Sequence, residues 1–167
     1  ALVYRTFAKD NQSNSSVVIK HIGDSRVYHF SAMTKTWRCI TRDHNLLNQL
    51  VDEQAAAENR QADFSKYNRE GMASPLYALT DCLIADSDLD NNPLPTFDSQ
   101  TLKVSSDDCL VVCTDGVHDL VPCDKWQSID KHTDLQAWLK QLRKQIYASE
   151  GRAYDNATAI LVRFDEH

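Results

Sequence analysis

The segment that decides the fold is Asp108-Cys-Leu-Val-Val-Cys-Thr-Asp-Gly-Val-His-Asp119. Its apolar run, 109–113, stands between the acidic pair Asp107-Asp108 and the turn residues Thr114-Asp-Gly116. A short, continuously apolar run bounded by turn residues is typical of a β-strand that is buried on both faces. The sequence therefore predicts a sheet covered on both sides, with an aspartate at the point where this strand ends.

Further short runs of β-branched and aromatic residues predict more strands on both sides of this segment. They lie at 1–8, 16–22, 27–30, 37–40 and 157–164. The four residues Gly23-Asp-Ser-Arg26 separate the second run from the third, which predicts a hairpin. With the run at 37–40, the hairpin would extend into an antiparallel meander.

Two stretches have the apolar period of an amphipathic helix. The first begins after Asp43, which is placed to cap it, and its apolar face comprises Leu46, Leu47, Leu50, Val51 and Ala55. The second carries Leu135, Trp138, Leu139, Leu142 and Ile146. Between them, residues 58–99 are polar and rich in turn residues, and we expect a flap or extended loop there. The chain is predicted to form one α+β domain over residues 1–167.

The composition is that of a globular domain, with 167 residues, 42% hydrophobic and 25% charged. No apolar run approaches the roughly 20 residues that cross a bilayer. A formal net charge of -6 disfavours nucleic acid and anionic membranes as partners. This acidic excess fits either plain solubility or a cluster of metal-binding carboxylates.

Cysteine and glycine exclude several kinds of site. The five cysteines are odd in number and lack CxxC spacing, which suits neither a disulfide framework nor a zinc site. Cys109 and Cys113 are expected to be buried, reduced thiols, and the protein is expected in a reducing cytoplasm. With only four glycines, the chain has no Gly-rich phosphate loop.

Three aspartates stand where a predicted strand meets a tight turn, namely Asp24, Asp115 and Asp155. Carboxylates fixed at strand ends can converge, and convergent carboxylates bind hard cations such as Mg²⁺ and Mn²⁺. Asp119 would join Asp115 if the intervening turn folds into a helix. The alternative is that each aspartate only forms a turn, and Asp107 and Asp108 are expected to do no more than that.

Four segments, in order, resemble the metal-dependent protein serine/threonine phosphatases of type 2C, in their bacterial form. The first is Val18-Ile-Lys-His-Ile-Gly-Asp-Ser-Arg-Val-Tyr-His-Phe30, and the second begins Thr41-Arg-Asp-His-Asn45. The third is the 108–119 segment, and the fourth is Tyr154-Asp-Asn-Ala-Thr-Ala-Ile-Leu-Val162. Each pattern is weak alone, but together they span nearly the whole chain.

The resemblance implies an α-β-β-α sandwich of two antiparallel sheets flanked by helices, with its N-terminal part absent. It implies hydrolysis of phosphoserine and phosphothreonine in proteins by a metal-activated water, with two or three Mn²⁺ or Mg²⁺ ions in the complete domain. By motif, Asp115 and Asp155 would bind one metal, and Asp24, Asp115 and Asp119 a weaker one, with Gly116 in the same site. Asn156 would hold the turn. Expected partners are phosphorylated proteins and a protein kinase.

The family's N-terminal part normally supplies another acidic ligand, a phosphate-binding arginine and a D-G-x-G-G segment, none of which this sequence matches. Its one Asp-Gly pair is already assigned, so a complete two-metal site is not expected within this chain alone. Two hypotheses follow. The chain is a piece of a working phosphatase, which its opening in a strand at Ala1 favours, or it is a catalytically silent module that binds phosphoproteins or a regulatory partner. His118 is expected at the surface, the alternative being that it modulates the acidic site locally. Arg26 is expected to pair with structural carboxylates.

Overall fold

A computed structural model describes residues 2–6, 15–58, 75–83, 97–149 and 156–165. The chain divides into two compact units, each treated by itself below. The described residues of the first unit come from 1–21, 25–41 and 98–167, and those of the second from 22–24 and 42–97. The prediction of a single domain over 1–167 concerns how these units combine, and it stays a prediction.

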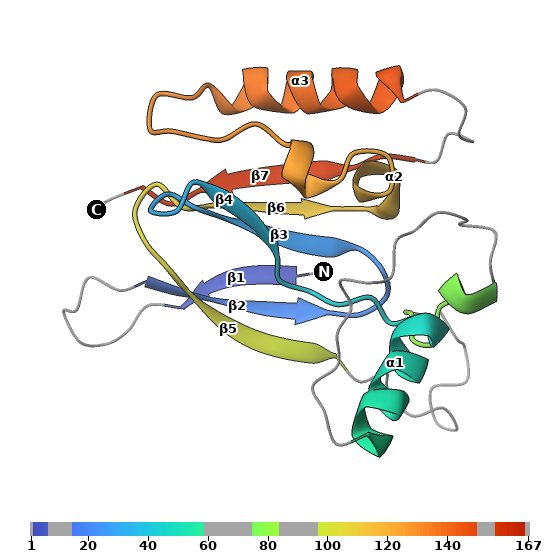
Figure 1. Ribbon diagram of the computed structural model, residues 1–167. Coiled ribbons are helices and arrows are strands. Elements are labelled where there is room, and N and C mark those ends of the chain that lie inside the picture. The colour runs from blue at the N-terminus through green and yellow to red at the C-terminus, as the bar shows by residue number, and fades with distance from the viewer. Residues whose placement is uncertain (1, 7–14, 59–74, 84–96, 150–155, 166–167) are drawn as a thin grey trace. The chain divides into compact units, whose positions relative to one another are not determined.

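The first unit contains two sheets in which all neighbouring strands are antiparallel (Figure 1). The three-stranded sheet has the order β1 (Leu2–Thr6), β2 (Ser15–His21), β5 (Asp98–Val104). The four-stranded sheet has the order β4 (Thr36–Cys39), β3 (Arg26–Ser31), β6 (Cys109–Cys113), β7 (Ala159–Arg163). The predicted α+β class, with two antiparallel sheets and flanking helices, is confirmed.

The predicted hairpin around Gly23-Asp-Ser-Arg26 is wrong. β2 pairs with β1 and β5, whereas β3 pairs with β4 and β6, so the turn passes from one sheet to the other. Val17 and Ile19 of β2 and Val27 of β3 are all buried in one apolar cluster. The two strands therefore bury their apolar residues against each other across the layers. Each pairs with one strand near it in the sequence, β1 or β4, and with one distant strand, β5 or β6.

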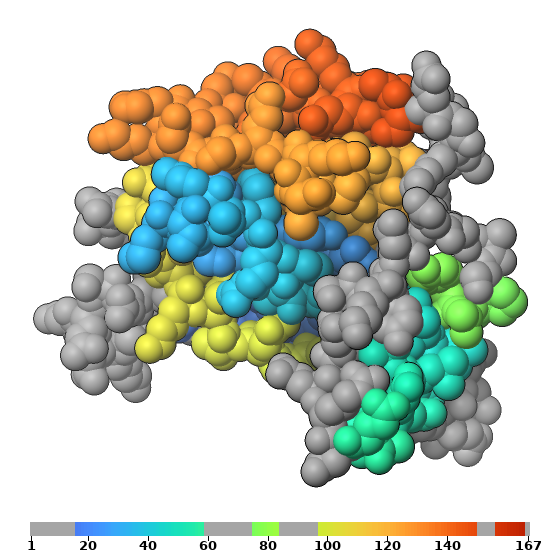
Figure 2. All heavy atoms as spheres, in the orientation of Figure 1, coloured from blue at the N-terminus to red at the C-terminus, as the bar shows by residue number. Residues whose placement is uncertain are grey.

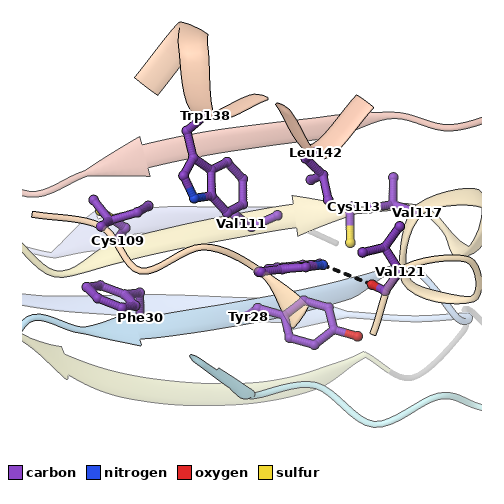
Figure 3. Close-up of a cluster of buried hydrophobic side chains, with 11 residues drawn as sticks. Tyr28, Phe30, Cys109, Val111, Cys113, Val117, Val121, Trp138 and Leu142 are labelled. Carbon is purple, nitrogen blue, oxygen red and sulfur yellow. Dashed lines mark hydrogen bonds between the residues drawn. The ribbon is translucent and has the colours of Figure 1, made fainter. Parts of the chain in front are cut away.

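β6 is buried on both faces, as its apolar run predicts. Leu110 lies in the cluster between the sheets, here called the inner core, with Val17, Ile19, Val27, Val104 and Phe164. Cys109, Val111 and Cys113 lie in a second cluster, here called the outer core (Figure 3). Burial raises the pKa of both thiols to about 12, so they stay protonated at neutral pH, as expected of buried reduced cysteines.

The outer core is closed by α3 (Leu135–Ala148), which carries the predicted apolar face and buries Trp138 and Leu142. Asp134 caps this helix by accepting hydrogen bonds from the amides of Gln136 and Ala137. In Figure 2 the orange atoms of this layer pack directly on the blue atoms of the sheet. None of the described helices is long and apolar enough to cross a membrane.

The three tryptophans of the chain meet in this layer. Their ring centroids are 5.2 Å apart for Trp37 and Trp126, 5.4 Å for Trp37 and Trp138, and 5.9 Å for Trp126 and Trp138. The indoles of Trp37 and Trp138 both donate to the carbonyl oxygen of Gln127. The indole of Trp126 donates to the carbonyl oxygen of Val121, and the dashed line in Figure 3 marks this bond. These bonds satisfy the polar atom of each ring, so the aromatic surface can be buried without an unpaired N–H.

The second unit contains α1 (Leu46–Ala57) and the short 3₁₀ turn η1 (Pro75–Tyr77). The predicted helix is present, but its cap is Asn45, whose side chain accepts from the amide of Asn48. Asp43, the predicted cap, lies two residues too early, and its carbonyl oxygen accepts from the Asn48 side chain. Of the predicted flap over 58–99, residues 59–74 and 84–96 lie outside the described residues, so the flap stays a prediction.

β5 is a strand that the sequence analysis missed. Its residues Asp98–Val104 are mostly polar and exposed, and Asp98 and Ser99 were expected to be loop. Only Val104 is buried, with Leu102 partly buried against the inner core. The strand is held by its seven-residue register with β2, a long-range pairing that local periodicity does not reveal.

Asp108 does more than form a turn. Its buried carboxylate accepts hydrogen bonds from the amide of Ala32 at 2.8 Å and from that of Ser105 at 2.9 Å. The same carboxylate lies 3.0 Å from Nε2 of His29, which is also buried. One side chain therefore ties the end of β3 and the segment after β5 to the start of β6. The expectation that Asp108 only forms a turn is wrong.

We predict that Asp108→Ala lowers the free energy of unfolding by about 2–4 kcal/mol, because two amides and an imidazole lose their acceptor in a mostly buried place. Urea titration followed by tryptophan fluorescence measures the change, and the exposed Asp124→Ala serves as control. A loss equal to that of the control would contradict the role assigned to Asp108.

Candidate metal centre

The candidate site begins where β6 ends, in the one-turn helix α2 (Asp115–His118). Oδ1 of Asp115 accepts from the amide of Gly116 at 2.8 Å, and the amide of Asp119 donates to the carbonyl oxygen of Asp115 at 3.0 Å. The turn thus folds into a helix, the condition under which Asp119 was expected to join Asp115. In the part of the chain described, no hydrogen bond occupies Oδ2 of Asp115, whose side chain is half-buried.

A clamp around Thr114 fixes the chain just before β7 next to Asp115. The hydroxyl of Thr114 donates to the carbonyl oxygen of Asn156 at 3.1 Å and accepts from the amide of Thr158 at 3.1 Å. The amide of Thr114 donates in turn to the carbonyl oxygen of Thr158. Asn156 holds this turn through its main chain, in agreement with its predicted role. Asp155 itself lies outside the described residues, and its role as a ligand stays a prediction.

Gly116 allows the main chain of Asn156 and Ala157 to lie against the start of α2. A Cβ atom at Gly116 would lie 2.7 Å from the carbonyl oxygen of Asn156 and 3.2 Å from Cα of Ala157. Since real Cβ atoms do not approach backbone this closely, any side chain here would push the two segments apart. The glycine therefore serves the packing of the site, a role that its sequence context did not reveal.

His118 is buried, and the expectation that it lies at the surface is wrong. Its side chain is 0% exposed and that of Asp119 is 5% exposed, and Nδ1 of the imidazole lies 3.0 Å from Oδ1 of the carboxylate. A one-turn helix enclosed on several sides can bury consecutive residues, and Gly116, Val117 and His118 are all buried. The pair gives the enclosed Asp119 carboxylate a hydrogen-bonding partner, which a buried charge requires.

Asp24 belongs to the second unit, so its predicted convergence with Asp115 stays a prediction. It is half-buried and follows Gly23, whose φ of +88° is a conformation that favours glycine. The amide of His44 donates to the carbonyl oxygen of Gly23 at 2.9 Å, and the Gly23 amide donates to Nδ1 of His44 at 3.3 Å. His44 thus supports the turn that presents Asp24.

Arg26 was expected to pair with structural carboxylates. Its guanidinium contacts the hydroxyl of Tyr28 at 3.3 Å, two residues along the same strand. Burial raises the pKa of this tyrosine, and the neighbouring Arg26 opposes that rise. Arg26 therefore has at least one structural partner next to the outer core, and its pairing with carboxylates stays a prediction.

The described carboxylates at the end of β6 suit a hard cation. Asp115 and Asp119 both offer carboxylate oxygens, the ligands that Mg²⁺ and Mn²⁺ prefer. The clamp and the glycine contact hold the Asp115 turn rigidly, and rigid ligands favour metal binding. The residues present thus fit a divalent metal ion at the end of β6.

The chain is similar to known protein phosphatases. No family model matches it. A Mycoplasma genitalium protein that carries a provisional protein phosphatase name is 29% identical over 156 residues, which cover 92% of this chain and 53% of the relative. The serine/threonine phosphatase Stp1 of Staphylococcus aureus superposes with a TM-score of 0.66 at 23% identity over 90% of this chain and 52% of its own. The catalytic domain of the phosphatase PstP, solved with 2 manganese ions, superposes with a TM-score of 0.56 at 22% identity. The match covers 94% of this chain and 55% of the PstP chain.

These likenesses show that the chain has the fold of bacterial serine/threonine phosphatases, as its four sequence segments indicated. The chain spans about half the length of the relatives that it matches.

We predict that Gly116→Ala lowers the free energy of unfolding by about 1–3 kcal/mol, since the added methyl group meets the main chain of Asn156. Ser128→Thr, which adds a methyl group at an exposed position, is the matched control. Thermal denaturation of the two variants measures the difference. Equal melting temperatures would show that Asn156 does not lie against Gly116.

Proposed function

We propose that this chain is part of a metal-dependent protein serine/threonine phosphatase. The observation that carries the proposal is the rigid Asp115 turn at the end of the doubly buried strand β6, within a fold shared with bacterial serine/threonine phosphatases. The provisional name of the Mycoplasma genitalium relative supports the same activity. The proposed reaction is hydrolysis of phosphoserine and phosphothreonine in proteins.

In this proposal Asp115 and Asp155 hold one metal ion, and Asp24, Asp115 and Asp119 hold a second, weaker one. Gly116 keeps the Asp115 turn against the segment before β7, and His118 orients the Asp119 carboxylate. Bound metal ions lower the pKa of a coordinated water and offset the charge of the phosphoryl group. Manganese is the favoured ion, because the PstP domain was solved with it, and magnesium fits the same oxygen ligands.

This chain lacks a match to one of the sequence segments that supply metal ligands in the family. No segment here matches the family's D-G-x-G-G, so in this proposal a further polypeptide segment would supply the missing acidic ligand. The complete site in this proposal has two or three metal ions.

The proposed partners are phosphorylated proteins and the protein kinase that modifies them. A reducing cytoplasm is the proposed location, and the five free cysteines, of which Cys39 and Cys82 are exposed, support it.

The test is Mn²⁺-dependent hydrolysis of para-nitrophenyl phosphate and of a phosphothreonine peptide. We expect turnover when this chain is fused to the part of the Mycoplasma genitalium relative that does not align with it. We expect little turnover from this chain alone. Asp115→Asn should lower the rate at least about 100-fold, as loss of a metal ligand does at such sites. The exposed Asp124→Asn should leave the rate unchanged.

Turnover that survives Asp115→Asn would contradict the assigned site. Absence of turnover in the joined protein would favour the catalytically silent module that binds phosphoproteins.

A further inference from the structure

The inner core is complete at β3 and β6 but ends before β7. Across the four-stranded sheet, Val27 of β3 is opposite Val112 of β6, which is opposite Ile160 of β7. Val27 is 0% exposed and packs in the inner core, Val112 is partly buried there, and Ile160 is 58% exposed. Two residues along the same face of these strands, Leu110 of β6 is 1% exposed, and Val162, its partner on β7, is 44% exposed. Apolar residues on one continuous face thus change from buried to open at the last strand.

This open face carries no charge of its own within β7. Arg163 alternates to the other face, where its guanidinium donates to the carbonyl oxygens of Thr133 at 3.2 Å and Asp130 at 3.5 Å. Ala159 and Leu161, also on that face, pack against the outer core. The residues of β7 that point inward are therefore apolar and exposed, while its one charge is tied to the outer layer.

The other edge strands with described side chains differ from β7. On β5 the exposed residues include Gln100, Thr101 and Lys103, and on β4 they include Arg38. Polar and charged residues on an edge strand discourage another strand from pairing with it. In the described part of the four-stranded sheet, β7 pairs only with β6, and its exposed residues offer no such protection. β7 is thus built as an edge that accepts a further strand.

The position of Ile160 and Val162 indicates what kind of partner covers them. A second copy pairing edge to edge would lengthen the four-stranded sheet, but it would leave the inner face of β7 without an opposing layer. Burying this face requires polypeptide that continues the three-stranded layer as well. The solved phosphatases of this fold contain nearly as much chain again as the part that matches.

We propose that the inner face of β7, formed by Ile160 and Val162, is the docking surface for the segment that supplies the part of the phosphatase fold not spanned by this chain. The choice of partner rests on the proposed function, whereas the surface itself rests on the packing of the sheets. The partner segment contributes a strand along β7 and apolar side chains that complete the inner core. Docking would also bring further ligands to the Asp115 turn, because β7 follows the Asn156 clamp directly.

The probe is the part of the Mycoplasma genitalium relative that lies outside its match to this chain, produced as a separate polypeptide. We expect a 1:1 complex in sedimentation velocity and slower hydrogen exchange at the amides of β7. The double variant Ile160→Lys/Val162→Lys should weaken the complex at least about tenfold, because two lysines would enter an apolar interface. Thr101→Lys, on the exposed edge of β5, is the control and should bind as the unaltered chain does.

Folding of each variant is checked by near-ultraviolet circular dichroism of the three tryptophans, which lie in the outer core. The double variant should keep this signal, since both of its sites are exposed.

Three results would overturn the proposal. These are absence of a complex, a complex that the double variant leaves unchanged, or self-association of the chain alone that the double variant abolishes. The last result would assign β7 to a second copy. All readouts are of binding, so a bound complex without phosphatase activity would refute the proposed function and leave the docking surface intact.

Discussion

The burial of β6 on both faces is the constraint on which the rest of the structure depends. Four of the five residues of β6 are buried and Val112 is partly buried, which requires one layer on each side of the strand; the three-stranded sheet and α3 provide those layers. Burial at both faces also holds the end of the strand rigidly, and Asp115 follows two residues after this end. The position of the candidate ligand is therefore a consequence of core packing, reinforced by the Thr114 clamp and the contact at Gly116.

Much of this arrangement can be predicted from sequence because it depends on local patterns. The apolar run of β6 and the period of α3 each report burial within a single element. β5 could not be predicted in this way, since its residues are polar and its register with β2 decides its structure. The hairpin prediction failed for a related reason. A tight turn defines the distance between two strands, but it does not determine whether they share a sheet.

At the candidate site, the sequence points out the candidate aspartates but not the contacts that support them. Aspartates at strand ends are visible in the sequence, whereas the burial of His118 against Asp119 depends on how α2 is enclosed. Asp108 shows the same limit, because two of its partners, Ala32 and His29, come from a distant strand and its end, whereas only Ser105 belongs to the same turn. Hydrogen bonds that one carboxylate accepts from different segments leave no periodic signal in the sequence.

The central claim is that divalent metal binds at the turn after β6, and paramagnetic broadening of amide resonances by Mn²⁺ tests it most directly. Titrating substoichiometric Mn²⁺ into the isotope-labelled chain should first broaden the amides of Asp115 to Asp119, and Asp115→Asn should remove the effect. Broadening confined to the exposed carboxylates Asp124, Asp130 and Asp134, or unchanged by the substitution, would contradict the account.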